Sequence, residues 1–393
     1  MQKGRQQKEG AMQSIPLNAL ATPKGHRYLC DICGGISTVM CPLCRSSYCC
    51  QEHYELDVLA VHPSICDTLA ELRKISASPP HSEKDRETQD AYRRNLRESI
   101  MTVAERAALE HLDGGKERAS TAMVAALRCL RFAAVSFPDE PLASVRPLFL
   151  LSEAALQAND FTSVHKYVLS ARRLLQVERE RVGDFLVGIV HDIPRTRDLA
   201  ELWADLHLLL GRAAHVQGKA SLDSINKDFS LAAYYSSLSQ GVESLQYGHC
   251  LYWTGMLYAD MGDTETARRY FGQVVSVWAK NCWFLIDNPS MQSDPLLYHD
   301  NVVPTLVQWY GEHLPSHMDH QRIRFVSSCV FAILGRFDEA IQVIGQVGVA
   351  LADREAALQA AGPGSAMSDT DPEELRVLTA RMDMLREMIN NAN

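Results

Sequence analysis

Cysteines crowd into one short stretch of this sequence. Of the 11 cysteines, seven lie between Cys30 and Cys66, with His53 and His62 among them. Read as ligands, the order of residues is C-x2-C-x7-C-x2-C-x4-C-x3-H-x8-H-x3-C. Thiolate and imidazole are donors that zinc prefers, and four of them close one tetrahedral structural site. The eight donors therefore predict two zinc ions. Cys50 is left over as an unligated thiol, with an exchange of roles between Cys49 and Cys50 as the alternative.

The spacing of the donors also predicts how they are held. Each CxxC pair offers two thiolates from one tight turn. Cys49 and His53 are four residues apart, so on a helix both would leave the same face. Pro63 suits the first turn of a helix, which places His62 at a helix start and Cys66 one turn further on. From spacing alone, the pairs can combine in sequence or interleaved.

The size and composition of the chain exclude several classes of protein. Its 393 residues leave room for two or three domains, and 46% of them are hydrophobic. A net charge of −9 argues against a nucleic-acid binder. Met1–Pro16 has no signal-peptide core, and no stretch approaches the roughly 18 apolar residues of a membrane span. We therefore expect no membrane partner and a reducing compartment, where clustered cysteines bind metal.

Helices are predicted almost throughout from Arg86 onward. Apolar residues recur there at three- and four-residue spacing, and the helices fall into pairs that resemble tetratricopeptide (TPR) repeats. The clearest unit spans 247–278. It has Gly262 at its turn and these residues at the small and large packing positions: Gly255, Tyr258, Ala267 and Phe271.

Three further units follow the same plan; the one at 325–347 fits closely, and the other two fit loosely. Their turn and packing positions are Ala155, Asn159 and Ala171; Leu210, Gly211 and Gly218; and Phe331, Gly335 and Ala340. Small residues would let paired helices approach closely, and each pair would leave an apolar face for the next. The period is irregular, so 182–196 and 286–301 are predicted as loops or extra turns. A generic helical bundle is the alternative.

These patterns predict a mostly α chain in which a small two-zinc finger precedes a TPR-like α-helical solenoid. The predicted limits are a disordered tail at 1–25, the finger at 27–67, a short helix and linker at 68–85, the repeat domain at 86–359, a linker at 360–371 and a C-terminal helix at 372–390. The C-terminal helix would cap the solenoid or dock on a partner.

The donor order resembles the MYND zinc finger. In that family the pairs interleave, and the resemblance implies one zinc held by Cys30, Cys33, Cys49 and His53 and a second held by Cys41, Cys44, His62 and Cys66. A HIT-type finger has a similar ligand string and is the alternative.

Two positions distinguish this finger from the peptide-binding MYND members. Those members carry Gln directly after the sixth ligand and Trp a few residues later, where this chain has Tyr54 and Val58. We therefore expect the finger to be architectural. His53 also stands where most MYND fingers have cysteine, but imidazole ligates zinc equally well.

No catalytic signature is found along the chain. The sequence contains no P-loop, dinucleotide fingerprint or nucleophile elbow, and none of the Asn-His-Ser-Cys string of SET methyltransferases. The histidines at 313, 317 and 320 are interpreted as a polar helix junction. We expect neither enzymatic activity nor a small-molecule substrate.

The finger, the repeats and the strings ALRCLRF and LFLLSEAAL together resemble the zinc finger MYND domain-containing protein 12 family of ciliary proteins. That resemblance implies a non-catalytic scaffold of the ciliary or flagellar axoneme, in the cytoplasm and cytoskeleton. Its implied partners are another TPR protein and inner-arm dynein subunits, with a role in flagellar motility. Two alternatives stay open: a soluble adaptor for dynein-arm assembly or co-chaperone, and a nuclear corepressor with a peptide-binding finger.

Overall fold

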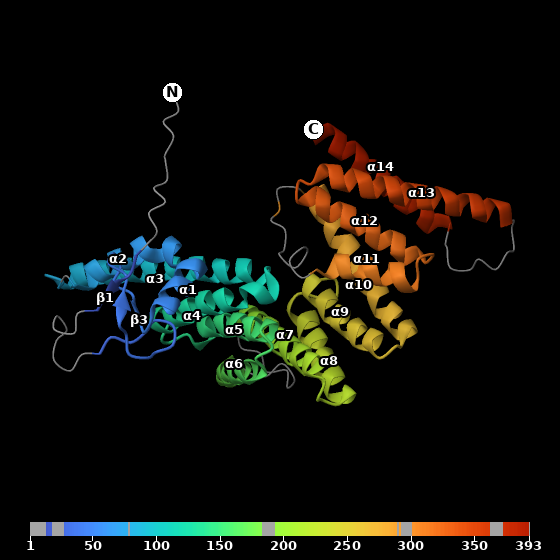
Figure 1. The fold of residues 1–393 in the computed structure, drawn as a ribbon. Coiled ribbons are helices and arrows are strands. Elements are labelled where there is room, and N and C mark those ends of the chain that lie inside the picture. The colour runs from blue at the N-terminus through green and yellow to red at the C-terminus, as the bar shows by residue number, and fades with distance from the viewer. Residues whose placement is uncertain are drawn as a thin grey trace, which may run out of the picture. The chain divides into compact units, whose positions relative to one another are not determined.

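The computed structural model describes residues 13–17, 27–77, 79–182, 193–288, 291, 301–361 and 372–392. Those residues form fourteen α-helices and one three-stranded antiparallel sheet (Figure 1). The predicted fold class, mostly α with an N-terminal Cys/His finger, is confirmed. The chain divides into two compact units, residues 1–192 and 193–393.

The sheet lies in the finger of the first unit. Its strands are β1 (Ile15–Pro16), β2 (Val39–Met40) and β3 (Ser47–Tyr48), in the order β1-β2-β3. Ile15 pairs with Met40, and Met40 pairs with Ser47. The predicted disordered tail is therefore wrong for Ile15 and Pro16, which complete this sheet. Residues 1–12 and 18–25 of that predicted tail lie outside the described residues.

Two helices complete the finger, and a third follows closely. They are α1 (Gln51–Ala60), α2 (His62–Ala77) and α3 (Glu83–Leu112). The predicted short helix and linker of 68–85 need correction, because α2 already begins at the predicted ligand His62 and α3 begins at Glu83. Ser82 fixes that start by accepting a hydrogen bond from the Asp85 N–H at 3.1 Å.

The rest of the first unit consists of helix pairs. α3 pairs with α4 (Ala119–Ser136), and α5 (Val145–Gln157) pairs with α6 (Phe161–Val182). Among the described residues, Gly115–Ser136 is the one helical stretch long and apolar enough to cross a membrane, with a mean hydropathy of 1.3. α4 packs against α1, α3 and α5, which accounts for that apolar composition.

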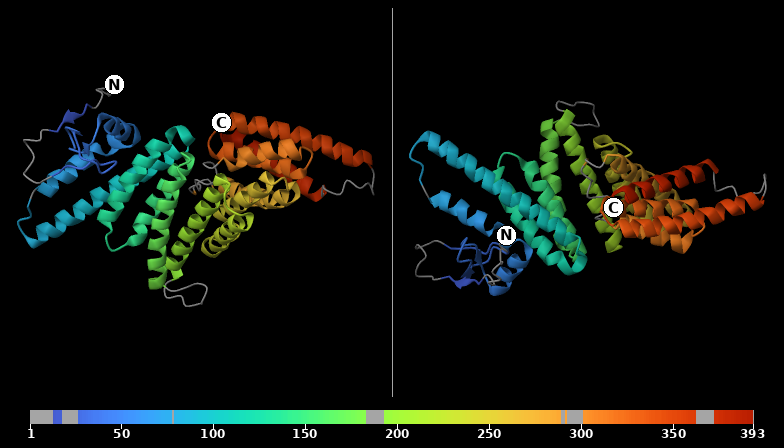
Figure 2. Two further views of the ribbon diagram at one scale, coloured as in Figure 1. Left: turned by 60° about the horizontal axis from the view of Figure 1, so that its bottom comes forward. Right: turned by 90° about the horizontal axis from the view of Figure 1, so that it is seen from above.

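The second unit contains three helix pairs, an inserted helix and a terminal helix (Figure 2). Their bounds are α7 (Ile193–Gln217), α8 (Leu222–Ser239), α9 (Leu245–Asp260), α10 (Thr264–Asp287), α11 (Val302–His313), α12 (Met318–Ile333), α13 (Phe337–Ala361) and α14 (Pro372–Ala392). The inserted helix is α11, which interrupts the pairing after α10. Of the predicted insertions and linker, 183–192, 289–290, 292–300 and 362–371 lie outside the described residues.

All four predicted turn residues adopt the left-handed conformation that commonly ends a helix. Their φ angles are 57° at Asn159, 65° at Gly218, 79° at Gly262 and 73° at Gly335. At three of these turns the next backbone N–H donates back to the last helical turn: Asp160 to Ala155 at 2.8 Å, Asp263 to Tyr258 at 3.0 Å and Arg336 to Phe331 at 2.8 Å. This is the Schellman arrangement, and it recurs at the predicted positions.

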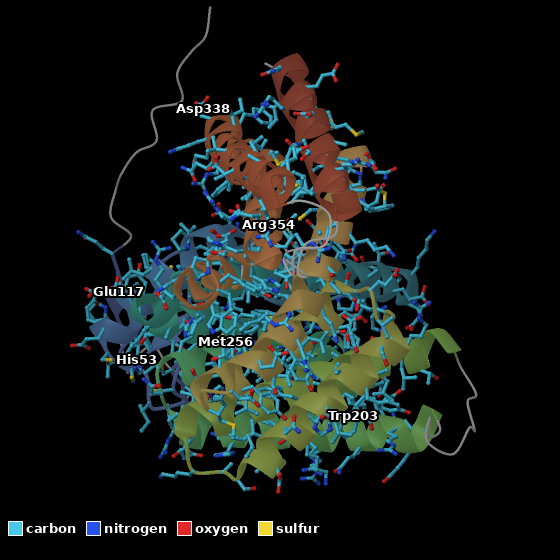
Figure 3. The ribbon with its side chains drawn as sticks, turned by 90° about the vertical axis from the view of Figure 1, so that its right-hand side faces the viewer. His53, Glu117, Trp203, Met256, Asp338 and Arg354 are labelled. Atoms are coloured by element: carbon cyan, nitrogen blue, oxygen red, sulfur yellow. The ribbon has the colours of Figure 1, made fainter. Side chains whose placement is uncertain are left out.

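Close glycine contacts bring the paired helices together. A Cβ at Gly255 would lie 2.4 Å from Phe271 Cε1, and one at Gly211 would lie 2.5 Å from Phe229 Cε1. The same glycine-to-phenylalanine contact thus recurs in α9/α10 and α7/α8. In the α7/α8 pair, Trp203 on α7 (Figure 3) also stacks toward Tyr235 on α8, with ring centres 6.0 Å apart. These repeated contacts support the helical-repeat interpretation over a generic bundle.

Candidate metal centre

The first donor set lies where the sheet meets α1. Cys30 and Cys33 come from one turn, which the backbone N–H groups of Ile32 and Gly35 hold by donating to the two sulfurs, each at 3.4 Å. Cys49 follows β3, and the other donor, His53, lies in the first turn of α1. The helix does not extend back to Cys49, because Cys50 caps α1 in an extended conformation and Cys49 precedes it. The donor atoms of Cys49 and His53 nonetheless lie close together in the same set.

The second donor set lies between β2, β3 and α2. Cys41 and Cys44 come from the turn after β2, where Arg45 has a φ of 58°. His62 is the first residue of α2 and Cys66 follows one turn later, as predicted. All four donor residues of this set are buried.

The donor distances match two tetrahedral sites. Within each set all four donor atoms lie within 4.8 Å of one another. A zinc ion with bonds of about 2.0 to 2.3 Å has donor edges of roughly 3.5 to 3.8 Å. Four edges lie in this range: Cys33 to Cys49 at 3.5 Å, Cys30 Sγ to His53 Nδ1 at 3.5 Å, Cys41 to Cys66 at 3.8 Å and Cys44 Sγ to His62 Nε2 at 3.7 Å. The edge from Cys49 Sγ to His53 Nδ1 is shorter, at 3.1 Å. The four longer edges fit zinc, and the sets are the interleaved ones.

In the second set, two neighbouring thiols oppose the ionisation of Cys66. Burial, Cys44 and Cys41 raise the pKa of Cys66. Burial also acts to raise the pKa of Cys44, but hydrogen bonds involving His62 and Ser46 outweigh it and lower the pKa to about 6. A divalent metal ion relieves this conflict, because it binds thiolates and deprotonates coordinating thiols outright.

A buried carboxylate orients one of the imidazole donors. His62 turns Nε2 toward Cys44, and its Nδ1 lies 3.0 Å from Asp57 Oδ2. The Tyr48 hydroxyl donates to the same carboxylate oxygen at 2.6 Å. Zinc-bound histidines usually donate their second ring N–H to a carboxylate in this way, which fixes the tautomer and the ring direction. Asp57 therefore supports the second site without touching its metal position.

The same carboxylate is held from the helical part of the unit. Arg128 on α4 donates from Nη2 to Asp57 Oδ2 at 2.7 Å and from Nε to Oδ1 at 3.2 Å. Its Nη1 lies 2.9 Å from Asp31 Oδ2, in the turn that carries the first donor set. Arg128 is only 4% exposed, and Asp57 is fully buried. Burial acts to raise the pKa of Asp57, but the charge of Arg128 and the His62 hydrogen bond keep it well below its usual range.

Further contacts hold the finger against the helices. Arg131, one turn after Arg128, donates to the backbone oxygen of Asp31. His111 Nε2 lies 2.8 Å from the Ala60 carbonyl oxygen, joining α3 to the end of α1. The finger, α3 and α4 are therefore parts of one packed structure, as their neighbouring ribbons show (Figure 1).

The structure brings together all eight residues that the sequence predicted as donors. It also adds Tyr48, Asp57 and Arg128, which the sequence analysis did not assign. A signal for Arg128 was present, because it interrupts the apolar string ALRCLRF. Cys50 is outside both donor sets, with its Sγ 3.6 Å from Cys49 Sγ.

The predicted histidine junction lies between α11 and α12. His317 caps α12 by accepting from the Asp319 N–H at 3.2 Å, and His320 Nδ1 lies 3.0 Å from the Pro315 carbonyl oxygen. These contacts give the histidines roles in helix termini. Neither residue belongs to a metal-binding set among the residues that the structure describes.

Each donor set already supplies four protein ligands, the full number for tetrahedral zinc. Such closed sites hold a fold together. A search of protein-family models finds none that matches this chain.

Proposed function

We propose that the protein is a non-catalytic scaffold in which two zinc ions stabilise a finger that is fixed to helical repeats. The observation that carries this proposal is the completeness of both Cys3His sets. Catalytic zinc keeps a coordination position for water or substrate, whereas four protein ligands leave none. The zinc ions would therefore contribute folding free energy, and activity would consist of binding other proteins.

The helical repeats support the binding part of the proposal. Stacked helix pairs present long surfaces that hold segments of partner proteins. In the second unit, the recurring Gly-to-Phe contacts and Schellman turns keep the paired helices in fixed geometry. A rigid surface binds with little loss of conformational entropy, which suits a scaffold.

We propose further that the protein works in the axoneme of cilia or flagella. Its partners there would be another TPR protein and inner-arm dynein subunits, and its role would be in motility. The support is the resemblance of the finger, the repeats and the string ALRCLRF. That string contains Arg128 and Arg131, both of which contact the finger, so the resemblance includes residues with a structural task.

Metal content tests the zinc part. The purified chain should contain two zinc ions by elemental analysis, and Cys66→Ser should lose at least the second. Cys50→Ser is the matched control, since Cys50 lies outside both sets, and it should keep both ions. A C66S chain that retained two zinc ions would contradict the assignment, and so would a C50S chain that lost one.

Extraction of ciliated cells tests the location and the partners. Tagged protein should stay with the axoneme after detergent treatment and should then co-purify with inner-arm dynein and a TPR protein. The C50S variant should behave like the parent chain, whereas C66S should not assemble. Release with the cytosol would favour the soluble assembly adaptor or co-chaperone, and recovery in nuclei would favour the corepressor.

A further inference from the structure

Cys49 and Cys50 place a spare thiol directly beside a metal ligand. Cys49 belongs to the first donor set, and Cys50 belongs to neither set. Their sulfurs lie 3.6 Å apart, close to the 3.5 Å that separates Cys33 and Cys49, two donors of one set. The other six cysteines between Cys30 and Cys66 are all donors. The first set therefore has a fifth sulfur within reach of one of its ligands.

The local fold holds the two sulfurs next to each other. β3 ends just before Cys49, and α1 begins just after Cys50. The Thr38 hydroxyl donates to the Cys49 carbonyl oxygen at 2.7 Å, which fixes the backbone at the end of the strand. Cys50 is the N-cap of α1, with an extended backbone at φ −151° and ψ 169°. The pair is thus held between a strand end and a helix start.

The first donor set is also the accessible one. Cys33 is exposed, and Cys49 and Cys50 are partly exposed, whereas all four donors of the second set are buried. Thiol oxidation depends on exposure and on a second cysteine close enough to form a disulfide. The first set combines both conditions, so a small oxidant in water should act on it before the second set.

We propose that Cys49 and Cys50 form a peroxide-sensitive switch that controls zinc binding at the first site. Hydrogen peroxide is the oxidant, and a disulfide between the two adjacent cysteines is the product. The proposal rests on the scaffold function and adds a form of regulation to it.

The chemistry takes two steps. The Cys50 sulfur attacks hydrogen peroxide and the O–O bond breaks, so that one oxygen stays on sulfur as a sulfenic acid and the other leaves as water. The Cys49 thiolate then attacks the Cys50 sulfur, and the S–S bond forms as the S–O bond breaks. The departing hydroxide takes a proton from solvent and becomes a second water. The two sulfurs together lose two electrons, and the peroxide gains them.

The disulfide removes one of the four ligands of the first site. Cys30, Cys33 and His53 remain, and three donors do not close a tetrahedral structural site. The turn that carries Cys30 and Cys33 also carries Asp31, whose carboxylate lies 2.9 Å from Arg128 on α4. Release of this zinc ion should therefore loosen a contact between the finger and the helices.

The same geometry makes the switch reversible. The Cα atoms of adjacent residues are about 3.8 Å apart, whereas a disulfide usually joins Cα atoms roughly 4.4–6.8 Å apart. A disulfide forced outside that range is strained and more easily reduced. A thiol reductant should therefore regenerate both cysteines and let the first site bind zinc again.

Zinc release from the full-length, zinc-loaded chain tests the proposal. The chain is treated with hydrogen peroxide, desalted at intervals and subjected to elemental analysis. The parent chain should fall from two zinc ions to one, and dithiothreitol with added zinc should restore the lost ion. Cys50→Ser should lose that ion at least about fivefold more slowly, because the spare thiol is gone. Cys250→Ala removes a buried thiol of the second unit and should release zinc at the parent rate.

Mass spectrometry locates the disulfide in the parent chain without relying on any variant. Trypsin releases residues 46–73 as one peptide, which contains Cys49, Cys50 and Cys66. Free thiols are alkylated under denaturing conditions before digestion. The oxidised peptide should then carry the label on Cys66 alone, whereas the untreated peptide should carry it on all three cysteines.

Three results would overturn the proposal. The first is a parent chain that keeps both zinc ions in peroxide, and the second is a C50S chain that releases zinc as fast as the parent. The third is a disulfide that joins Cys33 to Cys49 or links two chains. None of these changes the zinc count before oxidation, so the switch can fail while the scaffold function stands. A parent chain with fewer than two zinc ions before peroxide is added would instead count against the scaffold function itself.

Discussion

Arg128 and Asp57 form a two-point ion pair between the zinc finger and α4. The guanidinium donates to both carboxylate oxygens, at 2.7 Å and 3.2 Å, and both side chains are buried. The carboxylate also orients the ligand His62. A metal ligand and a helix of the repeats thereby share one buried anion, and this couples metal binding to the packing of the first unit.

Replacing Arg128 with Leu should destabilise the first unit severely. The substitution leaves Asp57 as a buried carboxylate without its cation, a change that costs about 3–5 kcal/mol in comparable cases. Guanidinium unfolding followed by circular dichroism measures the difference. Arg131→Leu is the control, since Arg131 is more exposed and does not reach Asp57, and it should cost less than about 1 kcal/mol. Equal losses of unfolding free energy in the two variants would show that the buried ion pair contributes no more to stability than the contacts of Arg131.

Asp57→Asn should weaken zinc binding at the second site while leaving the first site unchanged. Removing the carboxylate partner of a metal-bound histidine typically lowers metal affinity by about 10–100-fold. Competition with a chromophoric chelator gives the two affinities separately. Glu55→Gln removes an exposed acid of α1 and should change neither affinity.

Tyr48→Phe provides a milder version of the same test. It keeps the ring and deletes the hydroxyl that donates to Asp57. We expect a smaller loss of affinity than in D57N, again confined to the second site. An unchanged second-site affinity in both variants would mean that Asp57 does not orient His62 in the metal-bound protein.

The two sites should release zinc at different rates. Cys33 is exposed and two other donors of the first set are partly exposed, whereas all four donors of the second set are buried. A chelator therefore reaches the first ion more easily, and excess chelator should produce a fast and a slow phase of equal size. Cys33→Ser should abolish the fast phase alone. A single phase, or loss of the slow phase in C33S, would contradict this assignment.

The donors could be predicted from the sequence because thiols and imidazoles at short spacings commonly bind zinc. The turns at Asn159 and Gly262 could be predicted because a left-handed Gly or Asn commonly ends a helix. The pairing of the donors needed the MYND resemblance, since spacing allowed two arrangements. Arg128 and Asp57 lie 71 positions apart, and no local pattern reports a contact at that distance. The strand at Ile15 was missed because two residues carry no periodicity.

Gly255→Ala tests the helix pair on which the repeat interpretation depends most. The new Cβ would lie 2.4 Å from Phe271 Cε1, and Phe271 is fully buried, so neither group can yield without repacking the core. Overpacking of this kind costs about 1–3 kcal/mol.

Gly345→Ala is its matched control, because it also lies inside a helix but has no atom within 4 Å of its new Cβ. There the gain in helix propensity should stabilise the protein by roughly 0.5–1 kcal/mol. Urea unfolding followed by tryptophan fluorescence should therefore move the midpoint down for G255A and up for G345A. Shifts of the same sign would show that α9 and α10 are not held by this close contact.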